Sequence, residues 1–154
     1  MSLCCDVLSA LQGKTLVTAE SLTGGGIGAA LTRVSGASAV YKGGIISYTN
    51  AVKHNQLKVP MELLDQYGAV SGVVAKAMAE GARKVLEADV AVSVTGLAGP
   101  AGDEFGNPVG TVFIGYSDSS VTTVKHCLFS GSRESIRNQT AEAALQLVLS
   151  MQNK

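Results

Sequence analysis

Lys14–Gly28, KTLVTAESLTGGGIG, joins an apolar segment to a glycine-rich turn and indicates the architecture of the chain. Lys14–Glu20 has the composition of a strand. Glycines at positions 24, 25, 26 and 28 follow at once, and Ile27–Val34 has the apolar spacing of a helix. The stretch therefore predicts a strand, a tight turn and a helix in succession.

Outward from this unit, predicted strands and helices continue to alternate. Ser71 has the position of an N-cap, and the glycine-rich Gly96–Val109 is typical of a long surface loop, either functional or disordered. Further strands are predicted at Ile45–Tyr48, Asp89–Thr95, Gly110–Tyr116 and Val121–Phe129, and further helices at Leu3–Gln12, within Leu57–Tyr67, at Gly72–Leu86 and at Ser132–Met151.

This alternation predicts the α/β class, with residues 1–154 forming a single domain. We expect a three-layer α/β/α sandwich with a mixed, mostly parallel central sheet. The mixed character follows from Ser117–Ser120, which is short enough to be a turn between neighbouring antiparallel strands.

The composition narrows the functional classes. Basic and acidic residues number 12 each, and no segment forms the basic stripe of nucleic-acid proteins, so nucleic acid is not an expected partner. No apolar run reaches the roughly 20 residues of a membrane span, and the N-terminus lacks a secretion signal, so we expect a cytoplasmic protein with no membrane partner. Three cysteines and two distant histidines have no metal-ligand spacing, so we expect neither a metal site nor a cofactor.

Ser21 lies where the predicted strand meets the glycine-rich turn. A hydroxyl at a helix start lies near unpaired backbone N–H groups, which bind a phosphate or the oxyanion of a tetrahedral intermediate. Equally, Ser21 or Thr23 caps the helix and the glycines allow it to pack closely. The residues alone leave these two alternatives about even.

A serine nucleophile needs a base, and the candidates are Lys53, His54, Tyr48 and Glu20. Lys53 follows a predicted strand by a few residues, so it can lie at the same sheet edge as Ser21. A lysine acts as a base only where burial lowers its pKa towards neutrality. Otherwise Lys53 is an ordinary solvated lysine at a helix start, and sequence spacing does not choose between it and His54.

Two further segments are candidates for ligand contacts. Thr95–Gly102 leaves a strand end, the position at which open α/β sheets bind ligands, or is a connection without a special role. Arg133 and Arg137 lie four residues apart at the start of the last helix and share a face. They hold a phosphate, or they pair with surface carboxylates such as Glu134.

Several long blocks of the sequence resemble the CinA C-terminal domain family, whose stand-alone members are nicotinamide-nucleotide amidases. The blocks follow the family's order through nearly the whole chain: Thr18–Gly25 (TAESLTGG), Gly43–Lys53 (GGIISYTNAVK), Gly68–Ser71 (GAVS), Asp89–Pro100 (DVAVSVTGLAGP), Asn107–Gly110 (NPVG) and Phe129–Arg137 (FSGSRESIR).

The resemblance implies a cofactor-free amidohydrolase that converts nicotinamide mononucleotide to nicotinic acid mononucleotide and ammonia, in pyridine-nucleotide recycling. It implies that Ser21 attacks the carboxamide, Lys53 takes its proton, and Tyr48 assists or relays that proton. It also implies a homodimer with a small-molecule nucleotide as partner. The substrate-binding residues implied are Glu20, Thr23, Gly24, Gly25, Asn50, Thr95, Gly96, Gly99, Gly102 and Arg137, the last of them at the ribose phosphate.

Two positions depart from the family pattern. Leu22 follows the serine where cysteine is common, and Ala101 replaces a frequent aspartate. These departures give weight to a second hypothesis, a catalytically weak nucleotide-binding module. A third is a competence- or damage-related interaction domain.

Overall fold

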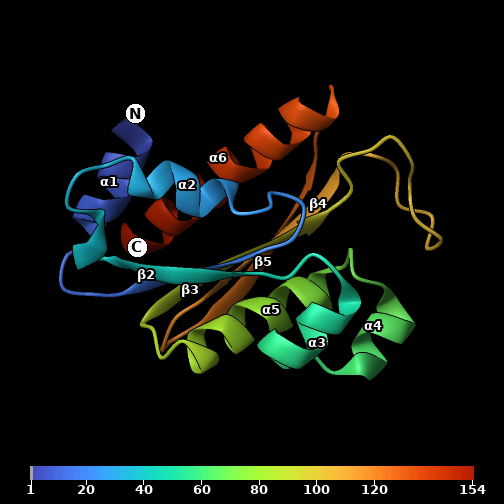
Figure 1. Ribbon diagram of the computed structural model, residues 1–154, viewed down its shortest axis with the longest axis horizontal. Coiled ribbons are helices and arrows are strands. Elements are labelled where there is room, and N and C mark those ends of the chain that lie inside the picture. Colours follow the sequence, from blue (N-terminus) through green and yellow to red (C-terminus); the bar gives the residue numbers. More distant parts are fainter. Residues whose placement is uncertain (1) are drawn as a thin grey trace.

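The predicted alternation of strands and helices is present in the computed structural model, which describes residues 2–154 (Figure 1). The strands are β1 (Leu16–Glu20), β2 (Tyr41–Ile46), β3 (Val90–Gly96), β4 (Thr111–Ser117) and β5 (Thr122–Leu128). The helices are α1 (Ser2–Ala10), α2 (Gly26–Thr32), α3 (Asn50–Leu57), α4 (Met61–Tyr67), α5 (Gly72–Val85) and α6 (Arg133–Gln152), with a short 3-10 turn at Ala37–Ala39.

The five strands form one sheet in the order β2-β1-β3-β4-β5. β1 pairs in parallel with both β2 and β3, while β4 is antiparallel to β3 and to β5. Four strands therefore run in one direction and only β4 runs against them, which confirms the mixed, mostly parallel sheet.

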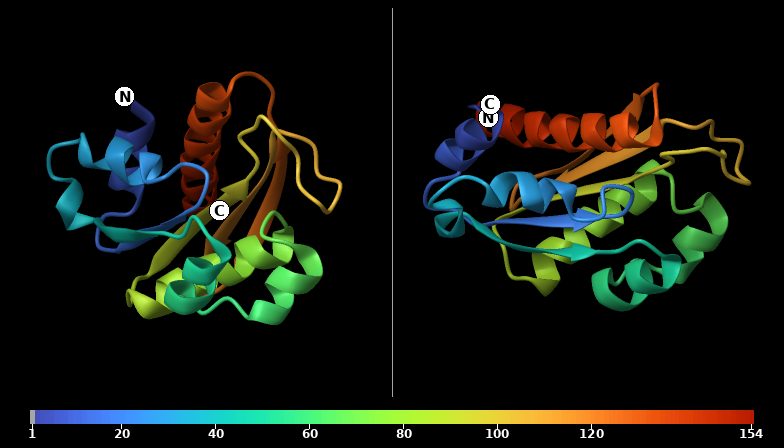
Figure 2. Two further views of the ribbon diagram at one scale, coloured as in Figure 1. Left: turned by 45° about the vertical axis from the view of Figure 1, so that its right-hand side comes forward. Right: turned by 45° about the horizontal axis from the view of Figure 1, so that its top comes forward.

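The helices cover both faces of this sheet, which confirms the three-layer sandwich (Figures 1 and 2). α1, α2 and α6 lie on one face, and α3, α4 and α5 on the other. The connection from β1 to β2 steps to one side of β1, and the connection from β2 to β3 steps to the other. Because parallel crossovers are right-handed, steps in opposite directions place their helices on opposite faces.

β1 is buried on both faces, because it lies between two strands and two helix layers. Leu16 packs into the core under α1, α2 and α6, whereas Val17 and Ala19 pack into the core under α5. Alternate residues of a strand point to opposite faces, so this short apolar segment contributes to both cores. Full burial of a valine or leucine side chain stabilises a fold by roughly 1.5–3 kcal/mol.

β2 begins earlier than predicted. The strand expected at Ile45–Tyr48 is instead Tyr41–Ile46. The first half of this strand was not predicted because it contains Gly43 and Gly44, and glycine has low strand propensity. Gly44 nevertheless suits its position, since a Cβ there would lie 2.2 Å from Thr18 Oγ1 on the neighbouring strand.

The helix predicted within Leu57–Tyr67 is α4, and α3 is a separate helix that ends where this range begins. α3 ends at Leu57, and α4 begins after Pro60. Proline disfavours helical backbone in the residue before it, here Val59, and therefore separates the two helices. None of the helices in the described part of the chain is long and apolar enough to cross a membrane.

Candidate active site

The parallel strands β1, β2 and β3 end at one edge of the sheet, and three candidate segments lie there. Ser21 directly follows β1, the 47–53 segment follows β2, and Thr95 and Gly96 end β3. The connection from β1 leads to β2 on one side, and the connection from β2 passes β1 to reach β3 on the other side. This edge is therefore a topological switch point, the usual ligand crevice of open α/β sheets. A cavity of about 290 Å³ lies here, lined by both Ser21 and Lys53.

Ser21 and Lys53 meet within this cavity. Lys53 Nζ lies 3.0 Å from Ser21 Oγ, although 32 residues separate them in sequence. α3 begins with the hydrogen bond from the Val52 N–H to Thr49 Oγ1, an N-cap that fixes the start of the helix from which Lys53 projects. The structure therefore places Lys53 as the base candidate next to the serine.

Lys53 is only 1% exposed, and burial lowers its pKa from 10.5 to about 8. Its Nζ donates to the carbonyl oxygens of Ser47, at 2.8 Å, and of Tyr48, at 3.3 Å. A neutral amine has two N–H bonds and one lone pair. Because the two carbonyls accept both N–H bonds, the lone pair of neutral Lys53 is left for the Ser21 hydroxyl.

His54, the alternative base, does not reach the serine. Its Nδ1 lies 2.8 Å from the carbonyl oxygen of Val59, in the turn that follows α3. Of the two candidates, Lys53 therefore lies beside Ser21, and the His54 ring is bonded elsewhere.

Glu20 supports the serine turn from within the protein rather than lining the cavity. It is 2% exposed, and Oε1 accepts hydrogen bonds from Thr23 Oγ1 (2.7 Å) and the Ile27 N–H (2.9 Å). Oε2 accepts from the Gly28 N–H (3.0 Å) and from Thr18 Oγ1 (3.1 Å). The carboxylate thus caps the N-terminus of α2, where the helix dipole favours negative charge.

Two backbone donors remain available beside Ser21. The Ser21 N–H already donates to the Val94 carbonyl at 3.1 Å, and the Gly24 N–H donates to the Ser21 carbonyl at 3.1 Å. Within residues 2–154, the N–H groups of Leu22 and Thr23 have no hydrogen-bond partner. Free N–H groups next to a nucleophile are suited to stabilising an oxyanion.

Tyr48 and Arg133 meet at the rim of the cavity. The Tyr48 side chain is 60% exposed, and its hydroxyl lies 3.1 Å from Arg133 Nη2. Arg133 Nη1 also donates to the Gly99 carbonyl. The contact between Tyr48 and Lys53 is made by the tyrosine's carbonyl oxygen, so the hydroxyl expected to relay a proton points to Arg133 instead.

Three of the predicted binding residues lie at the end of β3 or in the loop that follows it. Thr95, Gly96 and Gly99 line the cavity, and the buried Thr95 hydroxyl donates to the Ala69 carbonyl at 2.8 Å. That hydrogen bond ties the end of β3 to the residues before α5.

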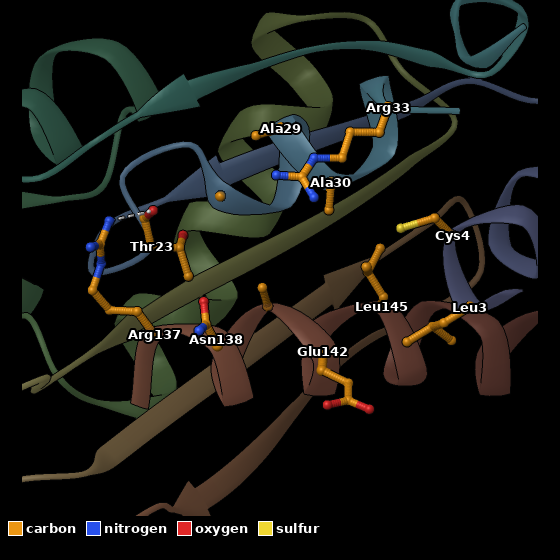
Figure 3. A pocket seen from close by; sticks show the side chains of 12 residues that line it. Leu3, Cys4, Thr23, Ala29, Ala30, Arg33, Arg137, Asn138, Glu142 and Leu145 are labelled. Atoms are coloured by element: carbon orange, nitrogen blue, oxygen red, sulfur yellow. Dashed lines mark hydrogen bonds between the residues drawn. The ribbon is translucent and has the colours of Figure 1, made fainter. Parts of the chain in front are cut away.

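Other predicted binding residues lie elsewhere. Thr23 and Arg137 line a different groove, between α2 and α6 (Figure 3). Asn50 is exposed at the start of α3, and Gly102 packs against Asn107, where a Cβ would lie 2.5 Å from the carbonyl oxygen. The residues placed outside the lining of the Ser21–Lys53 cavity are Glu20, Thr23, Gly24, Gly25, Asn50, Gly102 and Arg137.

The cavity also contains residues that were not predicted as binding residues. Arg133 had appeared in the sequence only as one of two arginines at a helix start, and nothing in the spacing favoured it over Arg137. The remaining lining residues are apolar, and three of them belong to the candidate segment Thr95–Gly102. They are Leu22, Ala69, Val70, Leu97, Ala98 and Ala101. Both departures from the family pattern, Leu22 and Ala101, are among them.

Metal ligands do not gather at this cavity or at any other site in the described residues, where no group of three or more His, Cys, Asp or Glu side chains is arranged to hold an ion. Within this part of the chain, the polar groups at the cavity are the hydroxyls of Ser21, Tyr48 and Thr95, the Lys53 amine, the Arg133 guanidinium and backbone amides.

Several known proteins are similar to this chain in sequence and in fold. The stand-alone PncC nicotinamide-nucleotide amidohydrolase of Pseudomonas putida is 46% identical over 136 residues, which is 88% of this chain and 85% of that protein. A CinA-like protein of Parasynechococcus marenigrum is 55% identical over 118 residues, 75% of this chain but only 28% of that longer protein. The chain therefore spans about a third or less of the CinA-like relatives it matches.

Solved structures agree with the sequence matches. A CinA superfamily protein from Klebsiella pneumoniae superposes with a TM-score of 0.95 at 32% identity, covering 99% of this chain and 96% of that one. A competence/damage-inducible protein from Agrobacterium tumefaciens gives 0.94 at 36% identity, covering 99% and 94%. Residues 3–152 match the sequence profile of the CinA C-terminal domain, and the chain belongs to that family.

Proposed function

We propose that this chain is an amidohydrolase that converts nicotinamide mononucleotide to nicotinic acid mononucleotide and ammonia, in pyridine-nucleotide recycling. The observation that carries the proposal is the buried Lys53 amine, 3.0 Å from the Ser21 hydroxyl and anchored by two carbonyls. The 46% identity to a protein named as a nicotinamide-nucleotide amidohydrolase supports the choice of substrate.

The acylation step uses Ser21 and Lys53. Neutral Lys53 Nζ takes the Ser21 proton while Oγ forms a bond to the carboxamide carbon, and the carbonyl oxygen becomes an oxyanion. The free N–H groups of Leu22 and Thr23 are the donors we assign to that oxyanion. The C–N bond then breaks, and the Lys53 ammonium returns its proton to the departing amide nitrogen, which leaves as ammonia.

In the hydrolysis of the resulting ester, Lys53 is again the base and a water molecule takes the place of Ser21 as the attacking group. The acyl-enzyme holds the whole nucleotide, joined through its former carboxamide carbon to Ser21 Oγ. Lys53 takes a proton from a water molecule, the water oxygen bonds to that carbon, and the Ser21 Oγ–C bond breaks. Ser21 regains its proton from Lys53, and nicotinic acid mononucleotide leaves.

Arg133 is our candidate for the ribose phosphate in place of Arg137. Besides Lys53, it is the cationic side chain that lines the cavity, and its present partners are neutral: the Tyr48 hydroxyl and the Gly99 carbonyl. A phosphate is a stronger acceptor for a guanidinium than either group. The Tyr48 hydroxyl then positions Arg133, and the Tyr48 carbonyl oxygen positions Lys53.

The test is ammonia release from nicotinamide mononucleotide, with nicotinic acid mononucleotide identified by chromatography. Ser21→Ala and Lys53→Met are expected to lower kcat at least 10³-fold, and the double variant no further, because the two residues act as a unit. Ser38→Ala and Lys76→Met, on the exposed surface, are the matched controls. Saturable nucleotide binding without ammonia from the unmodified chain would identify a binding module instead.

A further inference from the structure

Arg137 lies outside the Ser21–Lys53 cavity, yet it contacts the turn that bears the nucleophile. Its Nε donates to the Leu22 carbonyl at 2.9 Å. Its Nη2 donates to the Thr23 carbonyl at 3.1 Å (Figure 3). These bonds join residues 115 and 114 positions apart in sequence. We propose that Arg137 is a positioning residue, which fixes the oxyanion-binding N–H groups of the Ser21 turn and does not bind substrate.

The planar peptide bond links Arg137 to the donors. In a trans peptide the carbonyl of one residue and the N–H of the next point in opposite directions. When Arg137 holds the Leu22 carbonyl, it therefore fixes the direction of the Thr23 N–H, one of the two free donors. Holding the Thr23 carbonyl likewise fixes the Gly24 N–H, which closes the turn onto the Ser21 carbonyl.

The first turns of α6, which carry Arg137, are themselves held in place. α6 is capped by the Ser132 hydroxyl, which accepts from the Ser135 N–H at 3.1 Å, and Ile136 and Thr140 on the same helix are buried. The Ser21 turn also leaves space for the Arg137 side chain. Gly24 has a φ of +59°, and a Cβ there would lie 3.3 Å from Arg137 Nη2. A glycine thus leaves the guanidinium room to lie against the backbone.

The shape of arginine matters here as much as its charge. The guanidinium presents several N–H groups in one rigid plane, which allows two carbonyls to be held at once. A lysine retains the charge but is a single donor point on a flexible stem. Arg137→Lys therefore separates the two roles: a phosphate contact would be largely kept, whereas a fixed turn would be lost.

The experiment compares Arg137→Lys with the unmodified chain on two substrates, nicotinamide mononucleotide and nicotinamide riboside, which lacks the phosphate. This comparison rests on the proposed function. We expect kcat to fall about 10–100-fold on both substrates, with KM changed less than threefold, since a donor to the oxyanion contributes mainly to the transition state. Arg33→Lys, in the same groove and without a role in the turn, is the matched control and is expected to retain activity.

A second measurement does not need the proposed substrate. A fluorophosphonate ester bonds its phosphorus to a serine Oγ, releasing fluoride as Lys53 takes the proton, and its P=O oxygen requires the same N–H donors. Intact-mass spectrometry of the full chain gives the labelling rate of Ser21. We expect Arg137→Lys to slow labelling at least tenfold, at a melting temperature within a few degrees of the unmodified chain.

The outcomes distinguish the two proposals. Loss of activity on the mononucleotide alone would show that Arg137 binds phosphate, and an unchanged labelling rate would show that it does not position the donors. Either result overturns the inference. No ammonia from the unmodified chain with either substrate would overturn the proposed function, while slower labelling of Arg137→Lys would still support the positioning role.

Discussion

Lys53 Nζ lies 3.0 Å from Ser21 Oγ and 2.8 Å from the Ser47 carbonyl oxygen, with no ion-pair partner anywhere in residues 2–154. An amine this buried, surrounded by neutral acceptors, lacks the carboxylate that would keep it charged. Its pKa of about 8 follows from that arrangement, and the same arrangement leaves its lone pair for the Ser21 hydroxyl.

Activity should therefore rise with pH through the pKa of Lys53. The neutral amine is the active form, and a pKa of about 8 leaves it roughly one-tenth populated at pH 7 and nine-tenths at pH 9. We expect kcat/KM for nicotinamide mononucleotide to increase by about tenfold over this range. A profile that is flat or falls between pH 7 and pH 9 would contradict Lys53 as the base.

The same pKa shift predicts how stability depends on pH. The unfolded lysine keeps its proton up to about 10.5 and the folded one only to about 8, so the unfolded state binds more protons between these values. The free energy of unfolding should therefore rise with pH in that window relative to Lys53→Met, by about 2 kcal/mol from pH 8 to pH 10. Urea titrations of both proteins measure the difference, and equal pH dependence would show that Lys53 is not perturbed.

Glu20 should be needed for the fold of the serine turn as well as for activity. Glu20→Gln places an NH₂ group against donors that now bond to a carboxylate, and we expect the free energy of unfolding to fall by roughly 2–4 kcal/mol. Activity should fall as well, because Thr23 and the start of α2 lose their acceptor. Glu80→Gln, on the exposed face of α5, is the control in the same denaturant titration.

Arg133 should affect recognition of the phosphate more than chemistry. Arg133→Ala is expected to raise KM for nicotinamide mononucleotide about tenfold and to change kcat little, since a lost charge-assisted contact weakens binding of ground state and transition state alike. Steady-state kinetics on the mononucleotide and on nicotinamide riboside test this. An equal rise in KM on both substrates would show that Arg133 does not act by binding the phosphate.

The layered α/β architecture was predictable from the amino-acid sequence, and the resemblance to a known family added Ser21 as the candidate nucleophile. The Lys14–Gly28 pattern specified a strand, a turn and a helix, because hydrophobic periodicity and glycine content are local properties. β2 was misplaced where Gly43 and Gly44 weakened the same local signal. The blocks around Ser21 and Lys53 were sufficient to single out both residues.

Which side chains meet depends on tertiary packing and was not predictable from the sequence. Lys53 and His54 are neighbours in sequence, but consecutive helix positions face different directions, so one reaches Ser21 and the other the Val59 carbonyl. Arg133 and Arg137 are likewise one helical turn apart, yet one lines the cavity and the other holds the serine turn from the adjoining groove. Contacts between residues 30 to 115 positions apart depend on how the helices dock on the sheet, and sequence spacing does not contain that geometry.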